Sequence, residues 1–132
     1  MGLLRSAKGQ SLVEFALVLG VLILILMGIF DFGRAVYAYN VIANCAWEGA
    51  RYGIIKPMDT AGIEDAARAR AVGLDPSELT VNISYPDGSS SSGSRLQVQV
   101  TYNFRAVTPL ITNFFGGSDH LTLQSTATMR IE

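Results

Sequence analysis

Apolar residues form one long block near the start of the chain. From Phe15 to Phe30 there are sixteen residues without a charge or a strongly polar group, and Leu12 and Val13 extend the block backwards past Glu14. A helix that crosses a bilayer needs roughly 17–25 residues at ~1.5 Å each. The pattern therefore predicts a transmembrane segment, which we assign to residues 10–30.

Beyond the apolar block, the chain from Asp31 onward has no proline until Pro57, so the helix is predicted to continue through residues 31–56. Small or apolar residues recur there at spacings of three and four, which places them on one helix face. This predicted packing face consists of Ala35, Tyr39, Ile42, Ala46, Gly49 and Gly53. We expect the face to receive the protein's own sheet, because small residues let backbones approach closely. Contact with another helix nearer the membrane stays open.

Residues 57–132 are predicted to form a small domain of helix and sheet. Asp59 or Thr60 can cap a helix that runs to about Val72, with Gly73 as its stop. The sequence Asp75 to Glu78 is typical of a short helical turn, with proline at its first helical position.

The hydrophobic period then changes to two, which predicts strands. Three stretches alternate apolar and polar residues, at Val81–Tyr85, Leu96–Phe104 and Leu121–Ile131. Strands with one apolar face each favour an antiparallel sheet, and the outer half of the long helix is the obvious cover for that face. The predicted fold class is therefore α+β.

Two connections are distinctive. The stretch from Pro86 to Ser94, "PDGSSSSGS", is typical of a flexible hairpin connection. The stretch from Thr108 to Gly117 is apolar for a loop. It is interpreted as a short helix that closes the end of the sheet, or as a patch that docks another subunit through Leu110, Ile111, Phe114 and Phe115.

Charge and composition narrow the function further. The net charge of −1 argues against nucleic-acid binding. Cys45 is the only cysteine and His120 the only histidine, so neither an intrachain disulfide nor a classical zinc site is expected. We find no catalytic constellation and expect no enzyme activity, no cofactor and no small-molecule substrate. Cys45 is interpreted as a small buried packing residue.

The N-terminus is predicted to stay in the cytoplasm. Arg5 and Lys8 precede the apolar block and no acid occurs before Glu14, so the positive-inside rule places the rest of the chain outside the cytoplasm. An ordinary secretory signal cut near Gly33-Arg34-Ala35 leaves Glu14 unexplained, and so does a plain uncleaved anchor.

The stretch "KGQSLVEF" resembles a type IV prepilin processing site. In that case residues 1–9 are a leader, the cut falls between Gly9 and Gln10, and Glu14 becomes the fifth residue of the mature chain. Cutting creates an amine on Gln10 one helical turn from Glu14. That amine offsets the cost of a carboxylate in the membrane, ~2.5–3.5 kcal/mol on insertion scales.

Three stretches in this order, "GQSLVEFALVL", "FDFGRAVYAYN" and "AWEGARYG", resemble the TadE-like family of minor pilins, or pseudopilins, in tight-adherence (Tad/Flp) pilus systems. The ending "LQSTATMRIE" is also similar, whereas the middle of the chain carries no matching motif. Gly20 departs from the family, whose members often have proline there. The resemblance implies a pilin-like fold and an inner-membrane location. It also implies three partners: a prepilin peptidase, other pilins and a pilus assembly platform.

Two hypotheses of different class follow. One is a structural pilus-assembly subunit, processed between Gly9 and Gln10. The other is an uncleaved single-pass anchor that presents a small binding or adhesion domain. Only the first requires removal of the leader.

Overall fold

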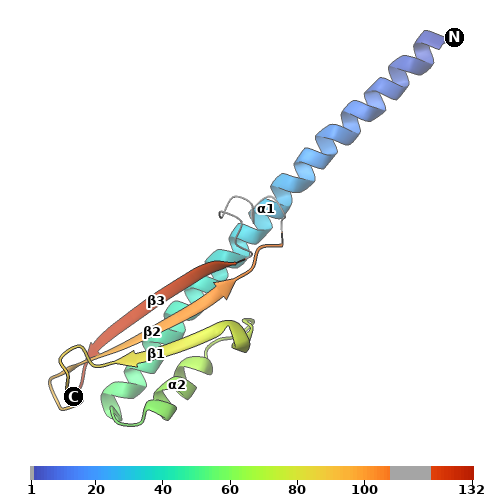
Figure 1. The fold of residues 1–132 in the computed structure, drawn as a ribbon. Coiled ribbons are helices and arrows are strands. Elements are labelled where there is room, and N and C mark those ends of the chain that lie inside the picture. The colour runs from blue at the N-terminus through green and yellow to red at the C-terminus, as the bar shows by residue number, and fades with distance from the viewer. Residues whose placement is uncertain (1, 108–119) are drawn as a thin grey trace.

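The computed structural model describes residues 2–107 and 120–132, with side chains described from Ala7 onward. Figure 1 shows one long helix whose N-terminal part projects away and whose other part lies against a three-stranded sheet. The elements in chain order are α1 (Gly2–Ile55), α2 (Thr60–Arg68), the short 3₁₀ helix η1 (Pro76–Glu78), β1 (Leu79–Ser84), β2 (Arg95–Phe104) and β3 (Leu121–Arg130). The predicted α+β class is confirmed.

Helix α1 runs without a break through the apolar block and into the domain. It begins at Gly2, so residues 2–9 of the assigned leader are helical as well. Its C-terminal end agrees with the prediction, because the helix ends at Ile55 and Pro57 follows. The last helical hydrogen bond runs from Lys56 N to Tyr52 O at 3.1 Å, and proline has no N–H to add another.

The sheet is antiparallel in the order β1-β2-β3, with β2 in the centre. In its register Val100 lies between Val81 on β1 and Ser125 on β3. Along β2 the buried side chains alternate with half-buried Gln97 and Gln99, which lie on the other face. The apolar face lies against the outer part of α1, as the alternating pattern predicted.

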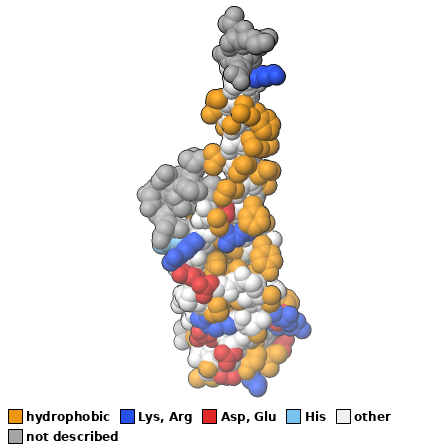
Figure 2. Space-filling view, turned by 90° about the vertical axis from the view of Figure 1, so that its right-hand side faces the viewer, with side chains coloured by type: hydrophobic (Ala, Val, Ile, Leu, Met, Phe, Trp, Pro, Cys, Tyr) orange, Lys and Arg blue, Asp and Glu red, His pale blue; other side chains and the backbone are white. Residues whose placement is uncertain are grey.

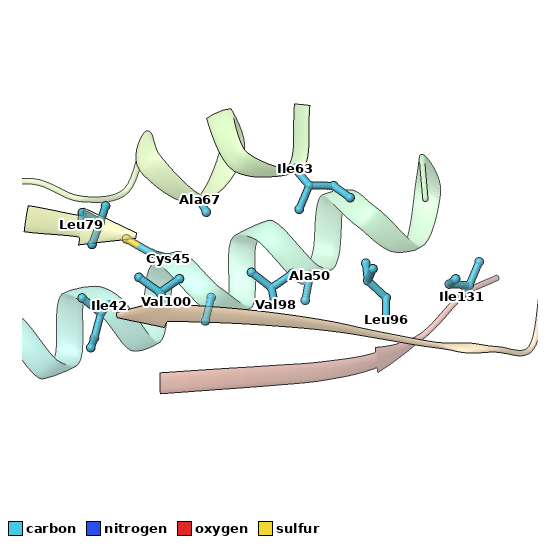
Figure 3. Close-up of a cluster of buried hydrophobic side chains, with 11 residues drawn as sticks. Ile42, Cys45, Ala50, Ile63, Ala67, Leu79, Leu96, Val98, Val100 and Ile131 are labelled. Atoms are coloured by element: carbon cyan, nitrogen blue, oxygen red, sulfur yellow. The ribbon is translucent and has the colours of Figure 1, made fainter. Parts of the chain in front are cut away.

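The core lies between α1, α2 and the apolar face of the sheet (Figure 3). Its largest fully buried side chains are Ile42, Ile63, Leu96, Val98, Val100 and Cys45. Helix α1 also contributes the small residues Ala46 and Ala50, so it lies close to β2. The predicted packing role of Cys45 is confirmed. Burial raises the pKa of its thiol, an effect that a backbone hydrogen bond partly offsets, and a protonated buried thiol is unreactive.

Helix α2 begins at a corner held by Asp59. The carboxylate of Asp59 caps the helix by accepting from Gly62 N at 3.0 Å, and it accepts a second hydrogen bond from the Tyr52 hydroxyl of α1 at 2.7 Å. The Tyr52 bond, followed by the Gly62 bond, lowers the pKa of Asp59 below its ordinary value. The corner therefore ties the start of α2 to the end of α1.

The prediction that this helix reaches Val72 is wrong, because α2 ends at Arg68. Beyond it the chain tightens into three-residue turns, with hydrogen bonds from Arg70 N to Ala67 O at 3.2 Å and from Ala71 N to Arg68 O at 3.1 Å. The guanidinium of Arg68 donates to Leu79 O at 3.1 Å, so it holds the chain as it returns to β1. Gly73 adopts φ of +79°, a conformation that favours glycine, but it lies in the turn beyond α2, so the prediction that it stops the helix is wrong as well.

The predicted hairpin connection joins β1 to β2, and Asp87 closes it. The Asp87 carboxylate accepts from Arg95 N at 2.9 Å and from the Arg95 guanidinium at 2.8 Å. These bonds lower the pKa of Asp87. The other distinctive stretch, with the expected short helix or docking patch at Leu110, Ile111, Phe114 and Phe115, lies outside the described residues.

Gly53→Ala is expected to destabilise the domain by about 1–3 kcal/mol, because overpacking a close contact forces its neighbours to move. A Cβ at Gly53 would overlap Leu96 Cδ2 and would lie 3.1 Å from Ile63 Cδ1. The matched control is Gly33→Ala on the same helix, where a Cβ meets no atom within 4 Å. That change should stabilise the helix by up to about 1 kcal/mol.

Thermal unfolding of the full chain in detergent micelles, followed by near-ultraviolet circular dichroism, measures both variants. A Gly53→Ala domain that melts at the wild-type temperature would contradict the close approach of α1 to β2.

Candidate assembly surface

The N-terminal half of α1 exposes apolar side chains on every side. We define the apolar stem as residues 12–30 of this helix. Consecutive residues Leu17, Val18 and Leu19 are all exposed, so no side of the helix is covered there. Figure 2 shows these hydrophobic side chains projecting beyond the mixed charges of the outer domain. Such a surface requires lipid or other apolar helices around it.

The stem has the dimensions of a membrane span. Among the described residues, one helix is long and apolar enough to cross a bilayer, and it lies near the N-terminus. The 19 residues of the stem extend ~28 Å at ~1.5 Å per residue. A bilayer core is ~30 Å thick. The stem thus accounts for a whole span and leaves the remainder of α1 for the domain.

Gly9, Gln10 and Glu14 lie at the N-terminal end of the stem, on continuous helix. Glu14 follows Gln10 by one helical turn, and its side chain is exposed. Within the described part of the chain it makes no hydrogen bond or ion pair. Gly9 has no atom within 4 Å of where a Cβ would be. Glycine costs a helix about 1 kcal/mol relative to alanine, so the bond between Gly9 and Gln10 is a weak point of this helix.

The predicted packing face divides into two parts. Ile42, Ala46, Gly49 and Gly53 are buried against the sheet and α2. Ala35 is half-buried and Tyr39 is 49% exposed, and neither belongs to the core. The sequence pattern treats the six positions alike, but the sheet covers only the outer four.

Asp31 is the residue whose position the sequence analysis missed. It directly follows the apolar stem, yet its side chain is only 2% exposed. Its carboxylate accepts from Val107 N at 3.1 Å and pairs with the Arg34 guanidinium at 3.3 Å. Arg34 in turn lies over the ring of Phe104 at 5.2 Å. The sequence signal for the ion pair was an acid and an arginine three residues apart at the end of an apolar run. No sequence signal indicates the contact between Asp31 and Val107.

An apolar groove opens beside Asp31, between α1 and the membrane-proximal ends of β2 and β3. It has a volume of about 440 Å³. We call it the stem groove. Its lining residues are Gly28, Asp31, Phe32, Ala35, Val36, Tyr39, Phe104, Ala106, Leu121 and Leu123. A second cavity of about 230 Å³ lies against the stem from Ile23 to Phe30 and shares Asp31 with the first.

The single cysteine and the single histidine of the chain lie in different environments. Cys45 is fully buried in the core, and His120 is exposed just before β3. Among residues 2–107 and 120–132, no three His, Cys, Asp or Glu side chains are grouped as metal ligands.

Comparison with known proteins gives one match. Residues 9–51 match the family model described as TadE-like protein. This region contains the proposed cut, Glu14, the whole apolar stem and the first part of the domain helix. No curated protein and no solved structure matches the chain.

Proposed function

Since residues 9–51 identify the chain as a TadE-like protein of Tad pilus systems, we propose that it is a minor pilin, or pseudopilin, made as a precursor and cut between Gly9 and Gln10. Residues 1–9 are then a leader, residues 10–30 the transmembrane segment, residues 31–56 the outer half of the long helix, and residues 57–132 the extracytoplasmic domain. The subunit works by assembly with other pilins on the pilus platform, in the inner membrane.

The observation that carries this proposal is the position of Glu14. It is an exposed carboxylate at the entrance of a stem that is otherwise apolar on every side. A carboxylate within a span costs ~2.5–3.5 kcal/mol on insertion scales. The amine created on Gln10 lies one turn away, and the amine of a neighbouring subunit offers the same charge. Either partner offsets the cost, and an intersubunit pair also fixes the stagger of two helices.

The proposed orientation puts the N-terminus in the cytoplasm, because Lys8 precedes the stem and the folded domain follows it. A protease confined outside the inner membrane should therefore cut the exposed loop at Ser91 and Ser92. Immunoblotting of intact spheroplasts, with and without detergent lysis, measures this. Protection of the loop until lysis would reverse the orientation.

Removal of the leader separates the two hypotheses. Protein made beside its own prepilin peptidase should yield a chain that starts at Gln10, seen by intact-mass spectrometry of the membrane fraction. Gly9→Leu should leave the precursor uncut, because a side chain at this position blocks access of a protease to the backbone and also strengthens the helix.

Gly20→Leu is the matched control for that change, since Gly20 is an equally open glycine of the same helix and lies far from the cut. It should be cut as the wild type is. Retention of residues 1–9 in native cells would instead identify an uncleaved anchor that presents a binding or adhesion domain.

Glu14→Leu should leave a subunit that is inserted and largely cut but that assembles poorly. A charge-assisted hydrogen bond contributes about 1.5–3 kcal/mol, so its loss should lower association with other pilins about tenfold or more. Glu14→Asp should be intermediate, because it keeps the charge with a shorter reach. Crosslinking and co-purification with the other pilins, normalised to membrane abundance, give the measurement.

Val13→Leu, at the neighbouring exposed position of the stem, is the control and should associate normally. Wild-type association by Glu14→Leu at equal abundance would show that Glu14 is merely tolerated at the membrane surface.

A further inference from the structure

The stem groove begins at the level where the apolar stem ends. Gly28 lies inside the stem and Tyr39 lies eleven residues further along α1, so the groove extends ~16 Å outward along the helix. Its opposite wall is the membrane-proximal end of the sheet, at Phe104, Leu121 and Leu123. The groove therefore extends from the membrane surface to the membrane-proximal end of the outer domain.

A second cavity lies on another side of α1. It lies against Ile23, Leu26, Met27 and Phe30 of the stem and against Val107, and Asp31 is the one lining residue that it shares with the stem groove. At ~100° per residue, the stem residues of this cavity point away from the groove residues Gly28 and Phe32, so the two are separate cavities. The carboxylate of Asp31 is held by Val107 N and Arg34. Because its charge is compensated by these contacts, the carboxylate of Asp31 does not disfavour an apolar occupant of the stem groove, which it also lines. Since Gly28 belongs to the stem, the stem groove itself begins at the bilayer surface.

We propose that the stem groove takes the acyl chain of a membrane lipid. The free energy of the acyl chain changes little when it moves from the bilayer into the groove, because lipid tails and apolar side chains are equally apolar surroundings. For the groove the change is favourable, because exposed Phe32, Val36 and Tyr39 are withdrawn from water. A headgroup need not move far, since the groove begins at the membrane surface. The proposal rests on the stem spanning a membrane and is independent of leader removal.

Tryptophan quenching by brominated lipid tests this with the full chain. The chain has one tryptophan, Trp47, so Trp47→Phe gives a protein without tryptophan fluorescence, into which a single reporter can be introduced. In this background Leu123→Trp places a reporter in the groove. Thr122→Trp places one on the same strand, one residue away, on the exposed face. Each variant is reconstituted in phosphatidylglycerol vesicles with bromine at mid-chain, and its emission is compared with that in unbrominated vesicles.

The Leu123→Trp emission should fall by about the same fraction as that of a Leu19→Trp variant, whose reporter lies in the middle of the stem. Thr122→Trp should be quenched much less. Ala35→Phe, which fills the groove from the helix side, should relieve the quenching at Leu123→Trp. Tyr39→Trp and its neighbour Asn40→Trp form a second pair on the helix wall, in case the strand variant does not fold.

Three results would overturn the proposal. The first is that the emission of Leu123→Trp and Tyr39→Trp is unquenched and red-shifted while that of Leu19→Trp is quenched. This result would mean that water fills the groove. Unquenched but blue-shifted emission that reddens on dilution with lipid would mean that a second copy of the chain fills the groove. An unquenched Leu19→Trp would mean that the stem does not enter the bilayer, which removes the basis of the pilin proposal as well. Quenching at the groove reporters in a protein that keeps its leader would support lipid binding and contradict the proposed processing, so the two proposals can fail separately.

Discussion

The close approach of α1 to β2 is the constraint on which the rest of the structure depends. At Gly49 a Cβ would lie 3.2 Å from Val98 Cγ1, and at Gly53 it would overlap Leu96. The helix that receives the sheet here is also the helix that forms the apolar stem. Each residue of a helix turns it by ~100° and advances it by ~1.5 Å. The spacing between the stem and these glycines therefore sets both the height and the orientation of the domain above the membrane.

Much of this fold could be predicted from the sequence, because its signals are local. The apolar block, the first proline and the change of period from three-and-four to two gave α1 and the three strands. The end of α2 could not be predicted, since it depends on Arg68 reaching Leu79 O and Pro76 O in the following turn. The candidate site could be predicted only in part from the sequence. Gly9, Gln10 and Glu14 belong to a linear motif, whereas the contact of Asp31 with Val107 joins residues 76 positions apart and the stem groove joins the helix to β2 and β3.

The packing face shows how a periodic pattern can be right and still incomplete. Six positions from Ala35 to Gly53 share one helix face, but periodicity carries no information on where the sheet ends. β3 begins at Leu121, which pairs with Phe104 at the end of β2. At this end of the sheet Phe104, Leu121 and Leu123 leave a groove between the strands and the helix. Ala35 and Tyr39 line that groove, whereas Ala46 and Ile42, on the same helix face, are buried in the core.

The two carboxylates that bound the apolar stem differ in how the chain compensates them. Asp31 is buried, and its cost of desolvation is offset within the chain by Arg34 and by Val107 N, so it joins the stem to the segment that follows β2 at the membrane-proximal end of the sheet. Glu14 is exposed and has no such contact in the described part of the chain. A segment selected only for insertion would be more favourable with an apolar residue there. We propose that Glu14 instead meets a cation outside the side chains of the stem, and the amine of a helix cut before Gln10 would be a cation at that depth. On this proposal one end of the stem is completed by folding, and the other by processing and assembly.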